Sequence, residues 1–245
     1  MRCILLLGVL PALLGAGLIA PALAQNTNHT YRPTGTRIVQ EPEPADPDLA
    51  RRLVKLTGSC VNRRFPDGAV ALLRGGNADA FAYAAQGIRN EDNESPLGLS
   101  ECLHEALNGA QLSTEMRIPE RNLRIALAED AYLRRHPQPL VIAPGSPGTL
   151  AGRAVIGGSS PEQARAMGLF ADCLVFTAPA EADSLLRGPV GGDEERANAR
   201  ALAPAIGACL ANGQQVNFTP TTIREYVADG LWARSEAMAA AGTAQ

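Results

Sequence analysis

Apolar side chains recur at helical spacing in two segments that open with the same start signal. In the first, Asp46 precedes Pro47, an N-cap residue followed by proline at the first helical position. In the second, two serines precede Pro161. The apolar positions that follow are Leu49, Leu53, Leu56 and Cys60 in the first segment, and Ala166, Leu169, Phe170, Cys173 and Leu174 in the second. This period predicts a helix over about 47–62 and an equivalent helix after residue 160.

The two segments open the halves of an internal repeat. The letters LLRG follow Cys60 as residues 72–75 and follow Cys173, at the same distance, as residues 185–188. Each half then carries a second cysteine, Cys102 or Cys209, followed by leucine and, within a few residues, by Asn-Gly. Finally, residues 123–132 match residues 223–232 at a shift of 100, with the pairs Leu123 and Ile223, Arg124 and Arg224, Glu129 and Asp229, and Tyr132 and Trp232. A set of matches in this order predicts two copies of one unit.

Each copy is expected to be a four-helix module, so the predicted fold is all-α with two related modules in tandem. The module contains a first helix with a cysteine, a short helix ending in LLRG, a third helical stretch with the second cysteine, and a long last helix. Module 1 covers residues 46–136 and module 2 residues 159–240, with a disordered tail at 241–245. In the last helix Ile223, Tyr226, Val227 and Leu231 form an apolar stripe that should face the core.

A Gly- and Pro-rich linker, residues 137–158, joins the modules. Its two apolar runs, residues 140–143 and 154–156, are short enough to pair as a minor two-stranded β-ribbon. We therefore expect no more than this small amount of strand in the chain.

The N-terminus has the pattern of a secretory signal. Arg2 precedes an apolar run over residues 4–20, and Ala-Leu-Ala at 22–24 is a cleavage site of small residues. The alternative is an uncleaved anchor, since about twenty apolar residues can span a bilayer. The glycines and Pro11 within the run favour cleavage, so we expect a signal peptide at 1–24, a flexible leader at 25–45, and no membrane span afterwards. The mature protein would then be periplasmic or secreted.

The four cysteines of the mature chain allow three pairings, and an exported protein can form disulfides. If the modules are equivalent, each should hold the same internal bond, which gives Cys60–Cys102 and Cys173–Cys209. Pairing between modules would need a special docking geometry. The chain has neither the Cys-x-x-Cys of a redox site nor the closely spaced knuckles of a zinc site, so we expect no metal there.

The amino-acid composition limits the class of partner that the chain can bind. The formal net charge is −3, and 46% of the residues are hydrophobic but only 4% aromatic. Acids outnumber bases by 25 to 22, and Lys55 is the single lysine. These values predict a globular protein that does not bind nucleic acid. The near-replacement of lysine by arginine also indicates a bacterial source with a high-GC genome.

No residue pattern predicts catalysis, a metal or a cofactor. His104-Glu105 lacks the second histidine of a zincin motif, and His136 and His29 have no partner in sequence. Ser146 lies in Pro-Gly-Ser-Pro-Gly, which is not a nucleophile elbow. The acidic residues 91–94 lack the order of a calcium loop and should form a hydrated surface.

The repeated charges have two interpretations. Arg74 and Arg187 end the short helices, where they could cap the carbonyl end beside a left-handed glycine and pair with the repeated acids Glu129 and Asp229. Alternatively, the repeated arginines could bind an anionic ligand twice.

The mature chain resembles secreted, Ala- and Arg-rich proteins of alphaproteobacteria that pair two-cysteine helical modules and have no assigned activity. The resemblance lies in the segment from Cys173 to Trp232, with its LLRG, ACLANGQ and TPTTIREYVADGLW runs. It implies no catalytic residue. We therefore expect a non-enzymatic binding or scaffold protein of the cell envelope, whose partner is another protein or a small ligand. The alternative is a secreted hydrolase acting on envelope material, with Glu129 and Asp229 as its acid and base.

Overall fold

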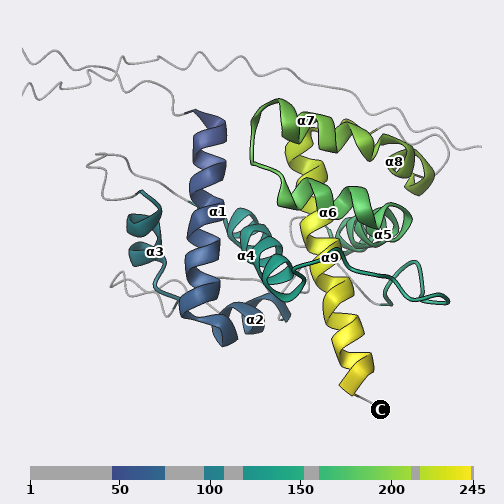
Figure 1. Cartoon of the computed structure of the whole chain (residues 1–245), viewed down its shortest axis with the longest axis horizontal. Coiled ribbons are helices and arrows are strands. Elements are labelled where there is room, and N and C mark those ends of the chain that lie inside the picture. The colour runs from purple at the N-terminus through teal and green to yellow at the C-terminus, as the bar shows by residue number, and fades with distance from the viewer. Residues whose placement is uncertain (1–45, 75–96, 108–117, 152–159, 211–215, 244–245) are drawn as a thin grey trace, which may run out of the picture. The chain divides into compact units, whose positions relative to one another are not determined.

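The computed structural model describes residues 46–74, 97–107, 118–151, 160–210 and 216–243. These residues form nine helices and no strand, which confirms the predicted all-α fold (Figure 1). The helices are α1 (Pro47–Arg64), α2 (Pro66–Arg74), α3 (Leu99–Ala106), α4 (Glu120–Arg135), α5 (Pro161–Thr177), α6 (Pro179–Arg187), α7 (Gly192–Ala201), α8 (Ala203–Cys209) and α9 (Pro220–Thr243). No helix in the described part of the chain is long and apolar enough to span a membrane.

Both predicted disulfides are present, one in each half of the chain. Cys60 of α1 is bonded to Cys102 of α3, and Cys173 of α5 to Cys209 of α8, with Cα atoms 5.4 and 5.8 Å apart. The third helical stretch of the second half is divided into α7 and α8, because Pro204 at the start of α8 cannot continue the hydrogen-bond ladder of α7.

The corner after the first helix is the same in both halves. Phe65 ends α1 with φ −133° and ψ 55°, and Ala178, 113 residues later, ends α5 with φ −137° and ψ 64°. Proline begins the next helix in each case, and these helices end at Arg74 and Arg187. Equal corners at equal offsets support the prediction that the halves are related.

The halves share one hydrophobic core rather than each having its own. Buried side chains from both halves belong to one cluster, and α4 packs against α1 of its own half and against α9 of the other (Figure 1). At two contacts the backbones approach closely, because a Cβ on Gly58 would lie 2.7 Å from Ala126, and one on Gly230 would lie 2.7 Å from the carbonyl oxygen of Ala171.

Some sequence-based expectations need correction. Leu49 and Leu56 are 43% and 53% exposed, because α1 turns the face of Gly58 and Asn62 toward α4 instead. Residues 140–143 form no strand, and residues 154–156 lie outside the described residues, as do the signal and leader segments 1–45. α9 continues through Thr243, into the expected tail, because its Ala-rich end favours helix.

Candidate binding site

A buried arginine from each half reaches across to an acid of the other half. Arg124 of α4 pairs with Asp229 of α9 at 3.2 Å, and Arg224 of α9 pairs with Glu129 of α4 at 2.7 Å. None of the four side chains is more than 5% exposed. Positions that match at the shift of 100 therefore meet each other in reciprocal ion pairs at the junction between α4 and α9, which we call the seam.

The same arginines also cap the short helices of their own halves. Arg124 donates to the carbonyl oxygen of Leu73 at 2.8 Å, and Arg224 donates to that of Leu186 at 2.9 Å. Leu73 and Leu186 occupy the same position in the two LLRG runs. Each arginine thus donates to a carbonyl oxygen that has no partner within its own helix, and also pairs with a carboxylate of the other half.

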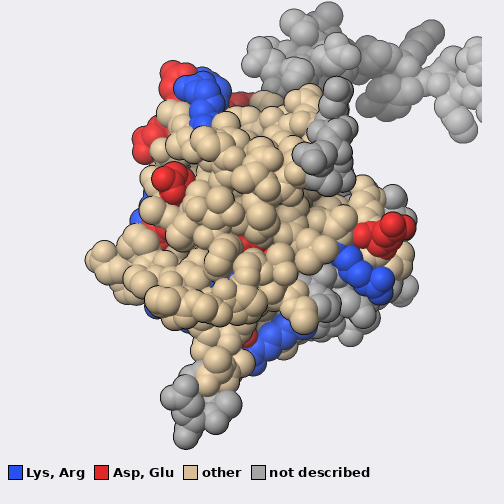
Figure 2. Space-filling model, turned by 90° about the vertical axis from the view of Figure 1, so that its right-hand side faces the viewer, with Lys and Arg blue, Asp and Glu red and all other residues tan. Residues whose placement is uncertain are grey.

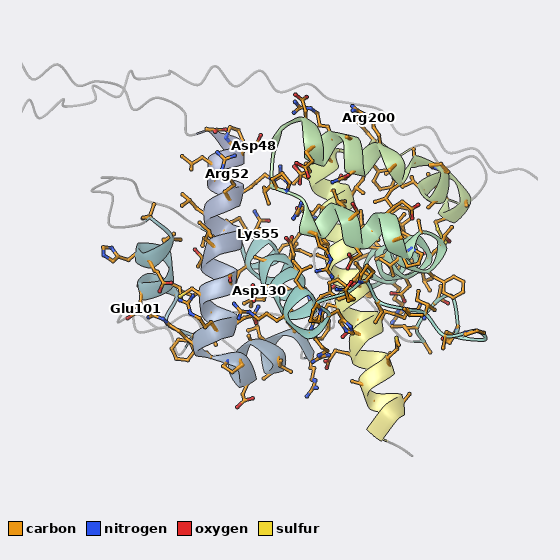
Figure 3. The ribbon with its side chains drawn as sticks, in the orientation of Figure 1. Asp48, Arg52, Lys55, Glu101, Asp130 and Arg200 are labelled. Carbon is orange, nitrogen blue, oxygen red and sulfur yellow. A yellow bond between two sulfur atoms is a disulfide. The ribbon has the colours of Figure 1, made fainter. Side chains whose placement is uncertain are left out.

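Glu129 receives a second cation, Lys55 of α1. The Lys55 ammonium lies 2.7 Å from Glu129 Oε1, on the side of α1 that faces α4 (Figure 3). Burial alone would raise the pKa of Glu129, but the hydrogen bonds and charges of Arg224 and Lys55 outweigh burial and lower this pKa. Glu129 is therefore held as a carboxylate.

A second buried carboxylate, Glu195 of α7, extends this charge network. Glu195 accepts hydrogen bonds from the Arg51 guanidinium and from the backbone N–H of Gly191, the latter at 2.9 Å. Burial alone would raise the pKa of Glu195, but the hydrogen bonds from Arg51 and Gly191 outweigh burial. The pKa of Glu195 is therefore lowered. Gly191 has φ 83°, and a Cβ there would lie 2.6 Å from Asp48, so only glycine fits this corner.

A cavity of about 200 Å³ lies above this network, between α1, α4, α9 and the loop before α7. Its walls are mostly apolar and include Ala50, Val54, Ile125, Ala126 and Val190. The charged side chains that line it are Arg51, Lys55, Glu129, Arg224 and Glu225. An apolar hollow with a few convergent polar groups is the usual form of a small-ligand site.

Glu225 differs from Glu129, the other carboxylate that lines the cavity. It pairs with Arg121, yet burial raises its pKa by more than the charges of Arg121 and Arg51 lower it. The cavity therefore contains one carboxyl with a raised pKa, Glu225, and one with a lowered pKa, Glu129.

The acids proposed for a hydrolase do not form a pair. Glu129 lines the cavity, whereas Asp229 is fully buried against Arg124. The predicted pairing of Arg74 and Arg187 with these acids is wrong, because Arg74 binds Glu236 and Arg187 binds Asp183.

Arg74 and Arg187 nevertheless reach matched positions of the opposite half. Arg74 donates to Glu236 at 2.6 Å, and Arg187 donates to the carbonyl oxygen of His136 at 2.7 Å. Residues 136 and 236 are related by the shift of 100. Gly188, expected to be left-handed, is extended with φ −68°. The carbonyls at the end of α6 are therefore capped by Arg224 and not by a left-handed turn.

The other candidate residues are scattered. His104 is exposed on α3, and Ser146 lies in a turn closed by its N–H to Ala143. His136 contacts Ser235 at 2.7 Å, and burial lowers the pKa of its ring. Within the described ranges, no group of three His, Cys, Asp or Glu side chains is placed to hold a metal. His29 and the acidic residues 91–94 lie outside those ranges.

Sequence reasoning did not identify the cavity, its charges Arg51 and Glu225, or the adjoining acid Glu195. These three residues lie on helices far apart in the chain. Of the other cavity charges, Glu129 and Arg224 were marked by the match at a shift of 100, and Lys55 stood out as the single lysine.

Comparison of the chain with family models, with curated proteins and with solved structures finds no match.

Proposed function

We propose that the mature chain is a non-enzymatic binding protein of the periplasm or extracellular space that takes a small ligand into the cavity at the seam. The observation that carries this proposal is the cavity of about 200 Å³, whose walls are apolar and whose charged groups are already engaged in ion pairs. Charges held in this way orient a ligand but do little acid–base chemistry. The cavity is smaller than most drug-sized sites, so the ligand should be small.

The exported location and the duplication belong to the same proposal. A cleaved signal at residues 1–24 would deliver the chain to an oxidising compartment, and two disulfides fit such a compartment. Duplication of one module would account for the matched corners and the reciprocal ion pairs. A binding site at the junction then uses residues of both copies.

The distribution of surface charge gives less support to a protein partner than the cavity gives to a small ligand. On the face shown in Figure 2, Lys, Arg, Asp and Glu lie in small groups of both signs with wide uncharged areas between them. A patch of one sign that would steer a charged partner is not seen among the described residues on that face. We therefore place the small ligand before the protein partner.

A secreted hydrolase is the second candidate. One observation favours it: Glu225 with a raised pKa and Glu129 with a lowered pKa line the same cavity, as an acid and a base would. Against it, both carboxylates are already paired with cations. Turnover of peptidoglycan, peptide, ester or phosphoester substrates that is lost in both Glu225→Gln and Glu129→Gln would establish the hydrolase and exclude the binding protein.

The binding proposal is tested by filling the cavity. Ala50 lines it, so Ala50→Trp should block it, whereas Ala201→Trp places the same indole on the exposed end of α7. A library of small metabolites is screened for compounds that raise the melting temperature of the disulfide-intact protein. We expect hits that stabilise the wild type and Ala201→Trp but not Ala50→Trp. Hits that act equally on all three proteins, or no hits, would contradict the proposal.

A further inference from the structure

We propose that the ligand of this cavity is a small monocarboxylate with a compact apolar body, and that the Lys55 ammonium binds its carboxylate. This inference rests on the proposed binding function and specifies its ligand class. The observations behind it are the exposure of the charged side chains that line the cavity and the contacts that Lys55 makes.

The more exposed charges of the cavity lining are positive. Of its three cations, Arg51 and Lys55 have side chains that are 23% and 33% exposed, whereas Arg224 is 5% exposed. Its two carboxylates, Glu129 and Glu225, are 5% and 18% exposed. Asp48, which pairs with Arg51 but does not line the cavity, is 39% exposed. Within the lining, the charges nearest to solvent therefore favour an anion over a cation.

Lys55 can turn to a ligand without leaving a buried group unpaired. Its two contacts are Glu129 Oε1 at 2.7 Å and the carbonyl oxygen of Leu186 at 3.4 Å. Arg224 already donates to both of these acceptors, at 2.7 and 2.9 Å. It also holds the second oxygen of Glu129 at 3.0 Å. Both acceptors therefore keep a hydrogen bond from Arg224 when Lys55 turns to a ligand, and Arg224 also pairs with Glu195 at 3.5 Å.

The chemistry of lysine fits this task. An ammonium is a compact charge with three rotatable donors, and two of them are used in the contacts above. Lys55 is the single lysine in a chain with 21 arginines, and it stands at the cavity rather than on the open surface. The other two cations of the lining, Arg51 and Arg224, are arginines.

The apolar walls define the rest of the ligand. Val54, Ile125, Ala126 and Val190 surround the hollow, and the latter three are less than one-tenth exposed. A short alkyl or ring body would bury its surface there while its carboxylate stays beside Lys55. Hexanoate has these features and is the first probe.

Calorimetric titration compares hexanoate with hexanamide and hexylammonium, which keep the chain and change the charge. We expect hexanoate to bind in the micromolar to millimolar range, hexanamide at least about ten-fold more weakly, and hexylammonium not at all. Lys55→Gln should weaken hexanoate at least about ten-fold and leave hexanamide unchanged. The matched control is Arg52→Gln, which removes an exposed cation of α1 that pairs with Asp46 outside the cavity and should leave hexanoate binding unchanged.

Acetylation of the folded wild-type protein removes the Lys55 charge without a mutation. The reaction is selective, because the only other amine is the N-terminus. It should weaken hexanoate binding at least about ten-fold, as Lys55→Gln does, which keeps the test decisive if that variant does not fold. Equal binding of hexanoate and hexanamide, blocked by Ala50→Trp, would overturn the carboxylate inference and leave the binding site standing. Tighter binding of hexylammonium would overturn the inference in the same way. No binding of any probe at millimolar concentration, together with no hits in the metabolite screen, would overturn both.

Discussion

Arg224 holds Glu129 in a two-point ion pair that joins the two halves of the chain, with N···O distances of 3.0 and 2.7 Å. The residues matched to them by the shift of 100, Arg124 and Asp229, form an ion pair in the opposite direction through one contact at 3.2 Å. Each of α4 and α9 therefore supplies an arginine to an acid of the other across the seam. The cavity is built directly over one of these pairs.

Breaking one partner of this pair should be costly. Arg224→Met leaves a buried carboxylate with Lys55 as its only cation and leaves the carbonyls of α6 uncapped, so we expect a loss of about 3–5 kcal/mol in the free energy of unfolding. Denaturant titration measures it. Arg196→Met is the control, because its pair with Asp193 is exposed, and it should cost less than about 1 kcal/mol. Similar losses in the two variants would mean that the seam is not held by this pair.

The reciprocal pairs should also couple the halves in unfolding. Since both halves contribute to one core, the fluorescence of the single tryptophan, Trp232 in the second half, should report the same transition as far-UV circular dichroism of all the helices. Two curves with different midpoints would show that the halves unfold independently, and the shared core would then not be the unit of stability.

The two disulfides should stabilise their halves by similar amounts. They close loops with sequence separations of 42 and 36 residues, for which the chain-entropy estimate is about 4 kcal/mol each. Replacing both cysteines of either pair by serine should lower the unfolding free energy by about that much. Non-reducing peptide mapping provides the direct check, and a peptide that joins Cys60 to Cys173 would contradict the assignment.

Acid should weaken the seam. Glu129 and Glu195 have pKa values below their ordinary 4.5 in the folded protein, so their stabilising effect is complete above pH 4.5 and is lost as the pH falls through the folded-state values. Glu225, with its raised pKa, acts in the opposite direction and offsets part of the loss. Urea unfolding of the wild type should therefore show falling stability below about pH 4.5, with a shallower fall in Glu129→Gln. A wild type that gains stability in acid would refute this balance.

The parts of the fold that depend on short segments of sequence could be predicted. Proline start signals and helical periods indicate α1 and α5, and the equal spacing of LLRG after each cysteine selects the two internal disulfides. The packing of helices that are far apart in the chain could not be predicted from such local patterns. The period of α1 includes Leu49 and Leu56, but contact with α4 was decided by the small Gly58, which has no hydrophobic signal.

The site shows the same limit. The repeat marked Arg124, Glu129, Arg224 and Asp229 as matched charges, but which arginine meets which acid depends on how α4 packs against α9, and that is set by the whole core. Arg51, which lines the cavity, is held by Glu195, 144 residues away, and neither residue belongs to the matched positions.

The single lysine allows the most direct test of ligand binding at the seam. Protein labelled with 13C at the lysine side chain gives one Lys55 signal, which can be followed by NMR during titration with hexanoate. Binding in the cavity predicts a saturable shift of this signal, with the dissociation constant found by calorimetry and with no shift in Ala50→Trp. A signal that stays in place throughout the titration would contradict the assignment of the cavity as the binding site.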